Sequence, residues 1–110
     1  MRIIQEIVPG RQITLAHIIA NPDEILYRQV GLEAKAAGAI GIVTVTPAET
    51  AIILGDIAIK AAGVSIGFAD RVSGSLLVTG TVSEVEAALT ALSDYAEHKL
   101  GFEVCGITKT

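Results

Sequence analysis

The chain contains no tryptophan, one cysteine, one methionine and only four aromatic residues among its 110 residues. The single cysteine, Cys105, excludes an internal disulfide and a zinc site built from the cysteines of one chain. So few aromatic residues disfavour RNA recognition by stacking on a sheet. Lys and Arg number 8 against 12 Asp and Glu, and the net charge of −4 disfavours a general basic surface. We therefore expect no nucleic acid and no membrane as a partner.

Long hydrophobic runs are also missing. The longest uncharged stretch, residues 36–48, has 13 residues, whereas a membrane-spanning helix needs about 20. The N-terminus reaches Glu6 without an apolar signal core, so we expect a cytoplasmic protein. Apolar residues nevertheless make up 51% of the chain. A domain of this size buries only about 60–70% of its unfolded surface, so the surplus predicts contacts between copies of the chain.

The hydrophobic pattern predicts alternating strands and helices. β-branched apolar runs predict strands at 13–20, 39–46, 64–69, 75–79 and 102–107. Three patterns typical of helix N-termini precede segments whose apolar residues have helical spacing. They are Asn21 followed by Pro22, and two capping boxes, Thr46 with Glu49 and Thr81 with Glu84. The helices are expected to end near Gly31, Ala62 and Leu100.

The order of these elements indicates an α+β fold. Residues 39–108 follow the strand–helix–strand–strand–helix–strand order of a ferredoxin-like domain, with helices on one sheet. A terminal strand at 1–8 and a strand–helix unit at 13–30 stand in front of it. The strands at 13–20 and 102–108 are both candidates for the strand that closes the sheet.

The predicted helix behind Pro47 has an unusually thin polar face. Its charged residues, Glu49, Asp56 and Lys60, are spaced 7 and 4 residues apart and fall on one stripe. Its other side chains are almost all small or apolar. We therefore expect this helix to be covered on most sides.

The sequence contains few residues that could carry a reaction. His17 lies within an apolar strand, His98 lies late in a helix, and Cys105 is expected to be a buried thiol. Nothing in their spacing indicates a nucleophile–base pair or a metal site. We expect no catalytic residue, no metal and no cofactor.

The turn between the strands at 64–69 and 75–79 is the most distinctive polar segment. It places Asp70, Arg71, Val72, Ser73 and Gly74 in succession. An ordinary hairpin turn has such a composition. A loop that lines a functional surface is the other interpretation, and both stay open at this point.

Several segments together resemble one known family. They are IIQEIVPG at 3–10, ITLAHIIANP at 13–22, GAIGIVTVTPAET at 38–50, GDIAIKAAGVSIGFADRVSG at 55–74 and CGITKT at 105–110. They are similar to the circularly permuted bacterial microcompartment (BMC) domain shell proteins of ethanolamine-, propanediol- and choline-utilisation compartments.

This resemblance implies a structural protein that is not an enzyme. Such proteins form homohexameric tiles that pack edge to edge, with other shell proteins, around aldehyde-metabolising enzymes in the cytoplasm. Encapsulated enzymes are further implied partners. The resemblance divides the chain into a barrel strand at 1–8 and a permuted BMC domain at 9–110, with residues 13–30 moved to the front. The strand residues Ile3, Ile4, Gln5, Glu6 and Ile7 are then expected to join a six-stranded barrel on the hexamer axis.

The resemblance also implies roles for two surface regions. The loop Asp70–Gly74 is expected to face the six-fold axis as a pore loop, although only Ser73 and Gly74 match the common pattern there. Alternating Asp70 and Arg71 side chains from six copies would form a closed polar collar. Lys60 is expected at the hexamer edge, with Asn21 where relatives carry an arginine.

A function of another class fits the same periodicity. An oligomeric, ferredoxin-like regulatory protein that senses a small molecule would show the same strands and helices. The terminal strand favours the shell tile, because a sensor has no need of six strands on an axis. A hexameric mass favours the tile, and a dimeric or trimeric mass favours the sensor.

Overall fold

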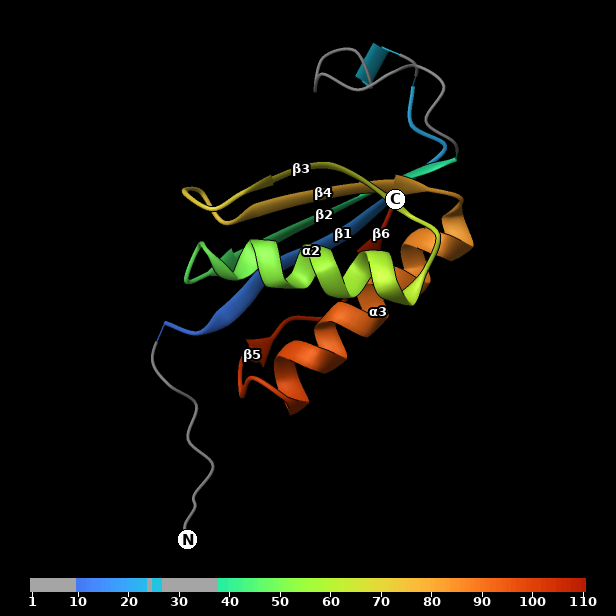
Figure 1. Cartoon of the computed structure of the whole chain (residues 1–110). Helices are drawn as coiled ribbons and strands as arrows, with labels where there is room; N and C mark the ends of the chain where they lie inside the picture. Colours follow the sequence, from blue (N-terminus) through green and yellow to red (C-terminus); the bar gives the residue numbers. More distant parts are fainter. Residues whose placement is uncertain (1–9, 24, 27–37) are drawn as a thin grey trace, which may run out of the picture.

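The computed structural model describes residues 10–23, 25, 26 and 38–110. These residues form one six-stranded sheet with two helices on one of its faces (Figure 1). In chain order the elements are β1 (Gln12–Ala20), β2 (Ala39–Thr46), α2 (Thr50–Ala61), β3 (Ser65–Asp70), β4 (Ser75–Gly80), α3 (Val82–His98), β5 (Glu103–Val104) and β6 (Thr108–Lys109). A mixed α+β fold, as expected from the sequence, is confirmed.

The sheet has the strand order β3-β4-β2-β1-β5, and β6 also pairs with β1. Each of the pairs β3–β4, β4–β2 and β2–β1 is antiparallel. β1 pairs with β2 from Gln12 opposite Thr46 to Ala20 opposite Ala39. Of the two candidates for the strand beside β2, the structure therefore selects the one at the front of the chain.

The C-terminal tail runs parallel to β1 along the outer edge of the sheet. Glu103 pairs with Gln12 and Thr108 pairs with His17, so the register is the same at both places. Between them the tail leaves the ladder, opposite a bulge in β1 between Ile13 and Leu15. The prediction of one continuous strand at 102–107 is therefore wrong, because the bulge interrupts the edge on which that strand would pair.

The main core lies between the sheet and the two helices. Leu54 from α2, Leu89 and Leu92 from α3, and Leu76 from β4 are completely buried there. The packing of α3 on β2 is close at Gly41, where an added Cβ would lie 2.7 Å from Val85 Cγ1. A smaller cluster covers part of the opposite face of the sheet, where Ile40 and Leu77 are buried and Leu26 packs against them.

The two capping-box patterns of the sequence have different outcomes. At α3 the box is confirmed: the Glu84 N–H donates to Thr81 Oγ1 at 3.1 Å, and the Thr81 N–H donates to Glu84 Oε1 at 2.9 Å. At α2 the prediction is wrong, because Thr46 is the last residue of β2 and pairs with Gln12. The helix begins three residues after Pro47, and Glu49 at its N-cap makes no side-chain capping bond.

Two predicted segments lie largely outside the described residues. The strand at 1–8, with Ile3, Ile4, Gln5, Glu6 and Ile7, is one of them, and most of the helix expected after Asn21 is the other. At the described start of that second segment, Asp23 Oδ1 accepts a hydrogen bond from the Ile25 N–H at 2.9 Å. Asp23 therefore satisfies the backbone at this point.

Candidate assembly surface

The hairpin loop 70–74 joins β3 to β4 and is closed by its own hydrogen bonds. The Gly74 N–H donates to the Asp70 carbonyl at 2.9 Å, and the Val72 N–H donates to Asp70 Oδ1 at 2.8 Å. The Ser75 N–H donates to Ser73 Oγ at 3.3 Å. Asp and Ser side chains commonly satisfy turn backbones in this way. The polar composition of the segment thus builds a rigid turn.

Gly74 fixes this loop against the end of β2. Its carbonyl accepts a hydrogen bond from the Val45 N–H at 2.9 Å, and its φ is +79°. A Cβ at this position would lie 2.2 Å from the Val45 carbonyl oxygen. Only glycine fits such a left-handed backbone so close to another strand.

The first three residues of the loop are all exposed, and the first of them, Asp70, is engaged by hydrogen bonds from the loop itself. The backbone N–H of Val72 and the Ser73 hydroxyl and N–H hold the pKa of the Asp70 carboxyl below its usual 3.8, because hydrogen bonds to the charged form favour it. Arg71 is exposed, and Val72 is 83% exposed at the tip. The surface that the loop offers is therefore a cation and an apolar side chain, next to an acid that the loop's own hydrogen bonds engage.

A cavity of about 220 Å³ opens at the same end of the sheet. We call it the Arg11–Phe102 cavity. Its wall is mostly apolar, and Arg11 and Glu49 contribute its charged groups. It is lined by Arg11, Pro47, Glu49, Thr50, Ile53, Leu100 and Phe102. Since they come from separate parts of the chain, no local sequence pattern indicates the cavity.

The outer surface of α2 carries large apolar side chains on both sides of its polar stripe. Ile52, Ile53 and Ile59 are 46–51% exposed. The sequence predicts that this helix is covered on most sides, and the single chain covers only the side that contains Leu54 and Ala58. The remaining apolar surface is available for contact with another molecule.

Lys60 lies at the opposite end of the sheet from the hairpin loop. It is in the last turn of α2, its side chain is 72% exposed, and its Nζ lies 2.8 Å from Asp56 Oδ2. Asn21 is exposed at the same end, where its N–H donates to the Gly38 carbonyl at 2.7 Å. The structure thus separates the two expected surface regions to opposite ends of the domain.

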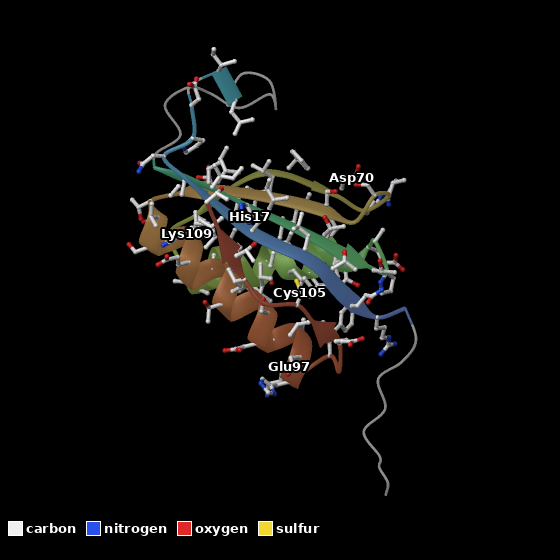
Figure 2. The ribbon with its side chains drawn as sticks, turned by 180° about the vertical axis from the view of Figure 1, so that it is seen from behind. His17, Asp70, Glu97, Cys105 and Lys109 are labelled. Carbon is white, nitrogen blue, oxygen red and sulfur yellow. The ribbon has the colours of Figure 1, made fainter. Side chains whose placement is uncertain are left out.

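The histidines and the cysteine do not form a common site. Figure 2 shows His17 on β1 beside the C-terminal tail; its Nδ1 lies 2.5 Å from Thr108 Oγ1, and its Nε2 lies 3.0 Å from Thr110 Oγ1. His98 is exposed at the end of α3, next to Glu97. Cys105 is half-buried against the main core, in a shallow hollow between β1 and β5.

Neither a metal site nor a membrane-spanning helix is found in the described part of the chain. No group of three or more His, Cys, Asp or Glu side chains there could hold a metal ion. No helix within these residues is both long enough and apolar enough to cross a membrane.

A model of the BMC domain family matches residues 39–107. The chain belongs to this family. It is 54% identical over 109 residues to the microcompartment shell protein EutS of Salmonella typhimurium, in an alignment that covers 99% of this chain and 96% of EutS. It is 50% identical over 109 residues to the shell protein PduU of the same organism, covering 99% of this chain and 93% of PduU. Among solved structures, "CutR flat hexamer, form 2" superposes with a TM-score of 0.88 at 48% identity, over 100% of this chain and 92% of that chain.

These similarities identify a bacterial microcompartment shell protein of the EutS, PduU and CutR type. Proteins of this family are structural and are not enzymes. The shell of a cytoplasmic microcompartment is accordingly the location of this BMC protein. The resemblance of the sequence to BMC domain shell proteins is confirmed, and the shell function is favoured over the regulatory sensor.

Proposed function

We propose that this BMC protein forms homohexameric tiles through a circularly permuted domain. The observation that carries the proposal is the place of β1 in the sheet. The family model begins at residue 39, with β2, yet the strand that completes the sheet beside β2 is β1, at 12–20. β1 precedes the matched region in the chain, yet it occupies a position in the sheet beside β2, which belongs to that region. A circularly permuted domain has this arrangement.

The two ends of the domain supply a radial direction. The hairpin loop 70–74 and the start of β1 lie at one end, because Val45 contacts Gly74 and Gln12 pairs with Thr46. Lys60 and Asn21 lie at the other end. In the proposed hexamer the loop of each subunit therefore lies at the six-fold axis. Lys60 and Asn21 lie at the rim.

The proposed axial barrel fits the same direction. Residues 1–8 join β1 through Gly10 and Arg11, at the end of the sheet that holds the hairpin loop. Six copies of this segment would meet over the six loops and form a closed barrel without exposed strand edges. We propose residues 1–8 as this barrel segment and residues 9–110 as the domain that carries it.

The apolar surface of α2 supports assembly. The exposed isoleucines Ile52, Ile53 and Ile59 come from a single helix. In a ring, each subunit has a neighbour on both sides, so apolar strips on two sides of one helix can both be covered. The similar CutR structure is that of a flat hexamer.

In the shell, such tiles would separate aldehyde-metabolising enzymes from the cytoplasm, as in ethanolamine, propanediol or choline utilisation. Other shell proteins and the encapsulated enzymes are the proposed partners. With the loops and the barrel on one axis, the centre of the tile is proposed to pass little solute. Its role would be closure of the shell or docking of a partner at the barrel.

Size-exclusion chromatography with multi-angle light scattering tests this proposal. The expected mass is about six times the 11.4 kDa of the chain. A stable monomer at micromolar concentration would refute it, and a dimer or trimer would favour the regulatory sensor. Electron microscopy of the purified hexamer is expected to show extended sheets of tiles.

A further inference from the structure

The hairpin loop 70–74 presents one apolar side chain on a rigid support. Val72 is 83% exposed, the most exposed of the large apolar residues in the described chain. The loop cannot turn it inward easily, because Asp70 binds the Val72 N–H and Gly74 is fixed against Val45. A single exposed apolar side chain is common on protein surfaces, so an insertion into a partner is indicated only where the protein also offers a site that fits this side chain.

The Arg11–Phe102 cavity lies at the same end of the domain but on the other side. The hairpin loop belongs to β3 and β4, at one side of the sheet, while Arg11 and Phe102 flank β1 and β5, at the other side. The β2–α2 connection, which contains Pro47, lines the cavity and also passes close to the loop, where a Cβ on Gly74 would lie 3.2 Å from Ala48 Cα. The loop and the cavity therefore lie on the two sides of this connection.

The dimensions of the cavity suit a small apolar group. Ile53, Leu100 and Phe102 line it, and its volume is about 220 Å³. An apolar cavity of about 150 Å³ accepts a benzene molecule. The isopropyl group of a valine is smaller than benzene, and the Arg11–Phe102 cavity is open to the surface, so its volume admits a valine side chain from another molecule.

The charged groups next to the two surfaces allow one ion pair between copies. Arg71 precedes Val72 at the loop tip, and the cavity is lined by one acid, Glu49, and one base, Arg11. Neither Arg71 nor Glu49 takes part in the ion pairs that form among the described residues. Because the Asp70 carboxylate is engaged by its own loop, Glu49 of a second copy is a better partner for Arg71 than Asp70 is.

We propose that Val72 of each subunit inserts into the Arg11–Phe102 cavity of the next subunit, with Arg71 against Glu49 of that neighbour. The inference rests on the proposed hexamer and specifies how its subunits meet near the axis. A projection on one side and a matching cavity on the other make a heterologous contact, which closes into a ring when the rotation between subunits permits. The occupant of the cavity is thus a second copy of this chain.

A charge-reversal cycle tests the polar part of the contact. Arg71→Glu and Glu49→Lys are each expected to weaken association about twofold to fivefold per contact, and the double variant is expected to restore it. Both side chains are exposed and the Glu49 side chain makes no capping hydrogen bond, so neither change threatens the fold. Lys60→Glu, at the far end of the domain, is the control. If the double variant associates no better than the single variants, the pairing is wrong.

A disulfide tests the insertion itself. Val72→Cys and Ile53→Cys are combined in a Cys105→Ser background and oxidised, and the products are separated without reductant. A ladder of covalently linked chains up to the hexamer is expected, and each single variant is expected to stay monomeric on the gel. The mass in solution is measured before oxidation.

The two measurements separate the two proposals. A hexamer without a ladder overturns the insertion and leaves the hexamer in place; residues 1–8 of the same chain would then be the alternative occupant of the cavity. A mass that is not hexameric overturns the proposed function. A hexamer with a ladder supports both.

Discussion

Replacement of Gly74 by alanine tests how the hairpin loop is held. Gly74 has a φ of +79°, and its carbonyl accepts the hydrogen bond from the Val45 N–H. The new Cβ would lie 2.2 Å from the carbonyl oxygen of that same Val45. The residue that binds the loop is therefore the residue with which the new methyl group collides.

The expected cost has two parts. A left-handed backbone costs a non-glycine residue about 1–2 kcal/mol. Separation of the loop from β2 then loses a hydrogen bond with a net value of about 1 kcal/mol. The free energy of unfolding is therefore expected to fall by about 2–3 kcal/mol in Gly74→Ala.

Alanine substitutions at two other glycines separate the cost of the backbone strain from the cost of the close contact. Gly101 has a φ of +72°, but a Cβ there would meet nothing within 4 Å, so Gly101→Ala is expected to cost only the backbone strain. A Cβ on Gly106 also meets nothing, and no positive φ is found there. Gly106→Ala is therefore expected to change stability by less than about 0.5 kcal/mol.

The assay is urea unfolding followed by far-ultraviolet circular dichroism. All variants are compared at one protein concentration, because association of subunits adds to the apparent stability. If Gly74→Ala costs no more than Gly101→Ala, the close contact with Val45 does not hold the loop, and the reasoning is refuted.

Four further predictions concern other parts of the molecule. Thr81→Ala removes the capping hydrogen bond of α3 and is expected to cost about 1 kcal/mol in urea unfolding, whereas Thr81→Ser is expected to cost little. Lys60→Glu is expected to leave the hexamer mass unchanged but to impair the sheets seen by electron microscopy; unchanged sheets would count against the edge role. Deletion of residues 1–8 is expected to preserve the hexamer in light scattering, and its dissociation would show that this segment is a main assembly element. Because the folded state holds the pKa of Asp70 below 3.8, the carboxylate stabilises the loop above pH 3.8, and this contribution is lost as the pH falls through the lower folded value. An NMR titration of the Asp70 carboxyl carbon is expected to show that low midpoint, and a midpoint at or above 3.8 would contradict it.

The sequence predicts local signals well when no other element competes for the same residue. Thr81 and Glu84 follow Gly80, the last residue of β4, and form their capping box as expected. Thr46 and Glu49 show the same pattern, but Thr46 is held in the sheet by its pairing with Gln12. Long-range strand pairing decided this case, and no local pattern reveals such pairing.

Features formed by distant parts of the chain could not be predicted from the sequence. The break in the C-terminal strand depends on a bulge in β1, near the other end of the chain. The Arg11–Phe102 cavity depends on separate segments that meet at one end of the sheet. In contrast, the hairpin loop is visible in the sequence as a distinctive polar segment, because its residues are consecutive.

The way the C-terminal tail ends determines where this protein tolerates a fusion. The Thr110 N–H donates to the Ile18 carbonyl at 2.9 Å, and the Ala20 N–H donates to the Thr110 carbonyl at 3.0 Å, so Thr110 is part of the sheet edge. An affinity tag or a cargo protein attached after Thr110 therefore starts from a fixed point, at the end of the domain away from the hairpin loop (Figure 1). Gly10, the first described residue, instead lies at the end of the domain that holds the loop. Because Ala20 binds Thr110 and precedes Asn21, an attachment after Thr110 would lie at the proposed rim of the tile and away from its proposed centre.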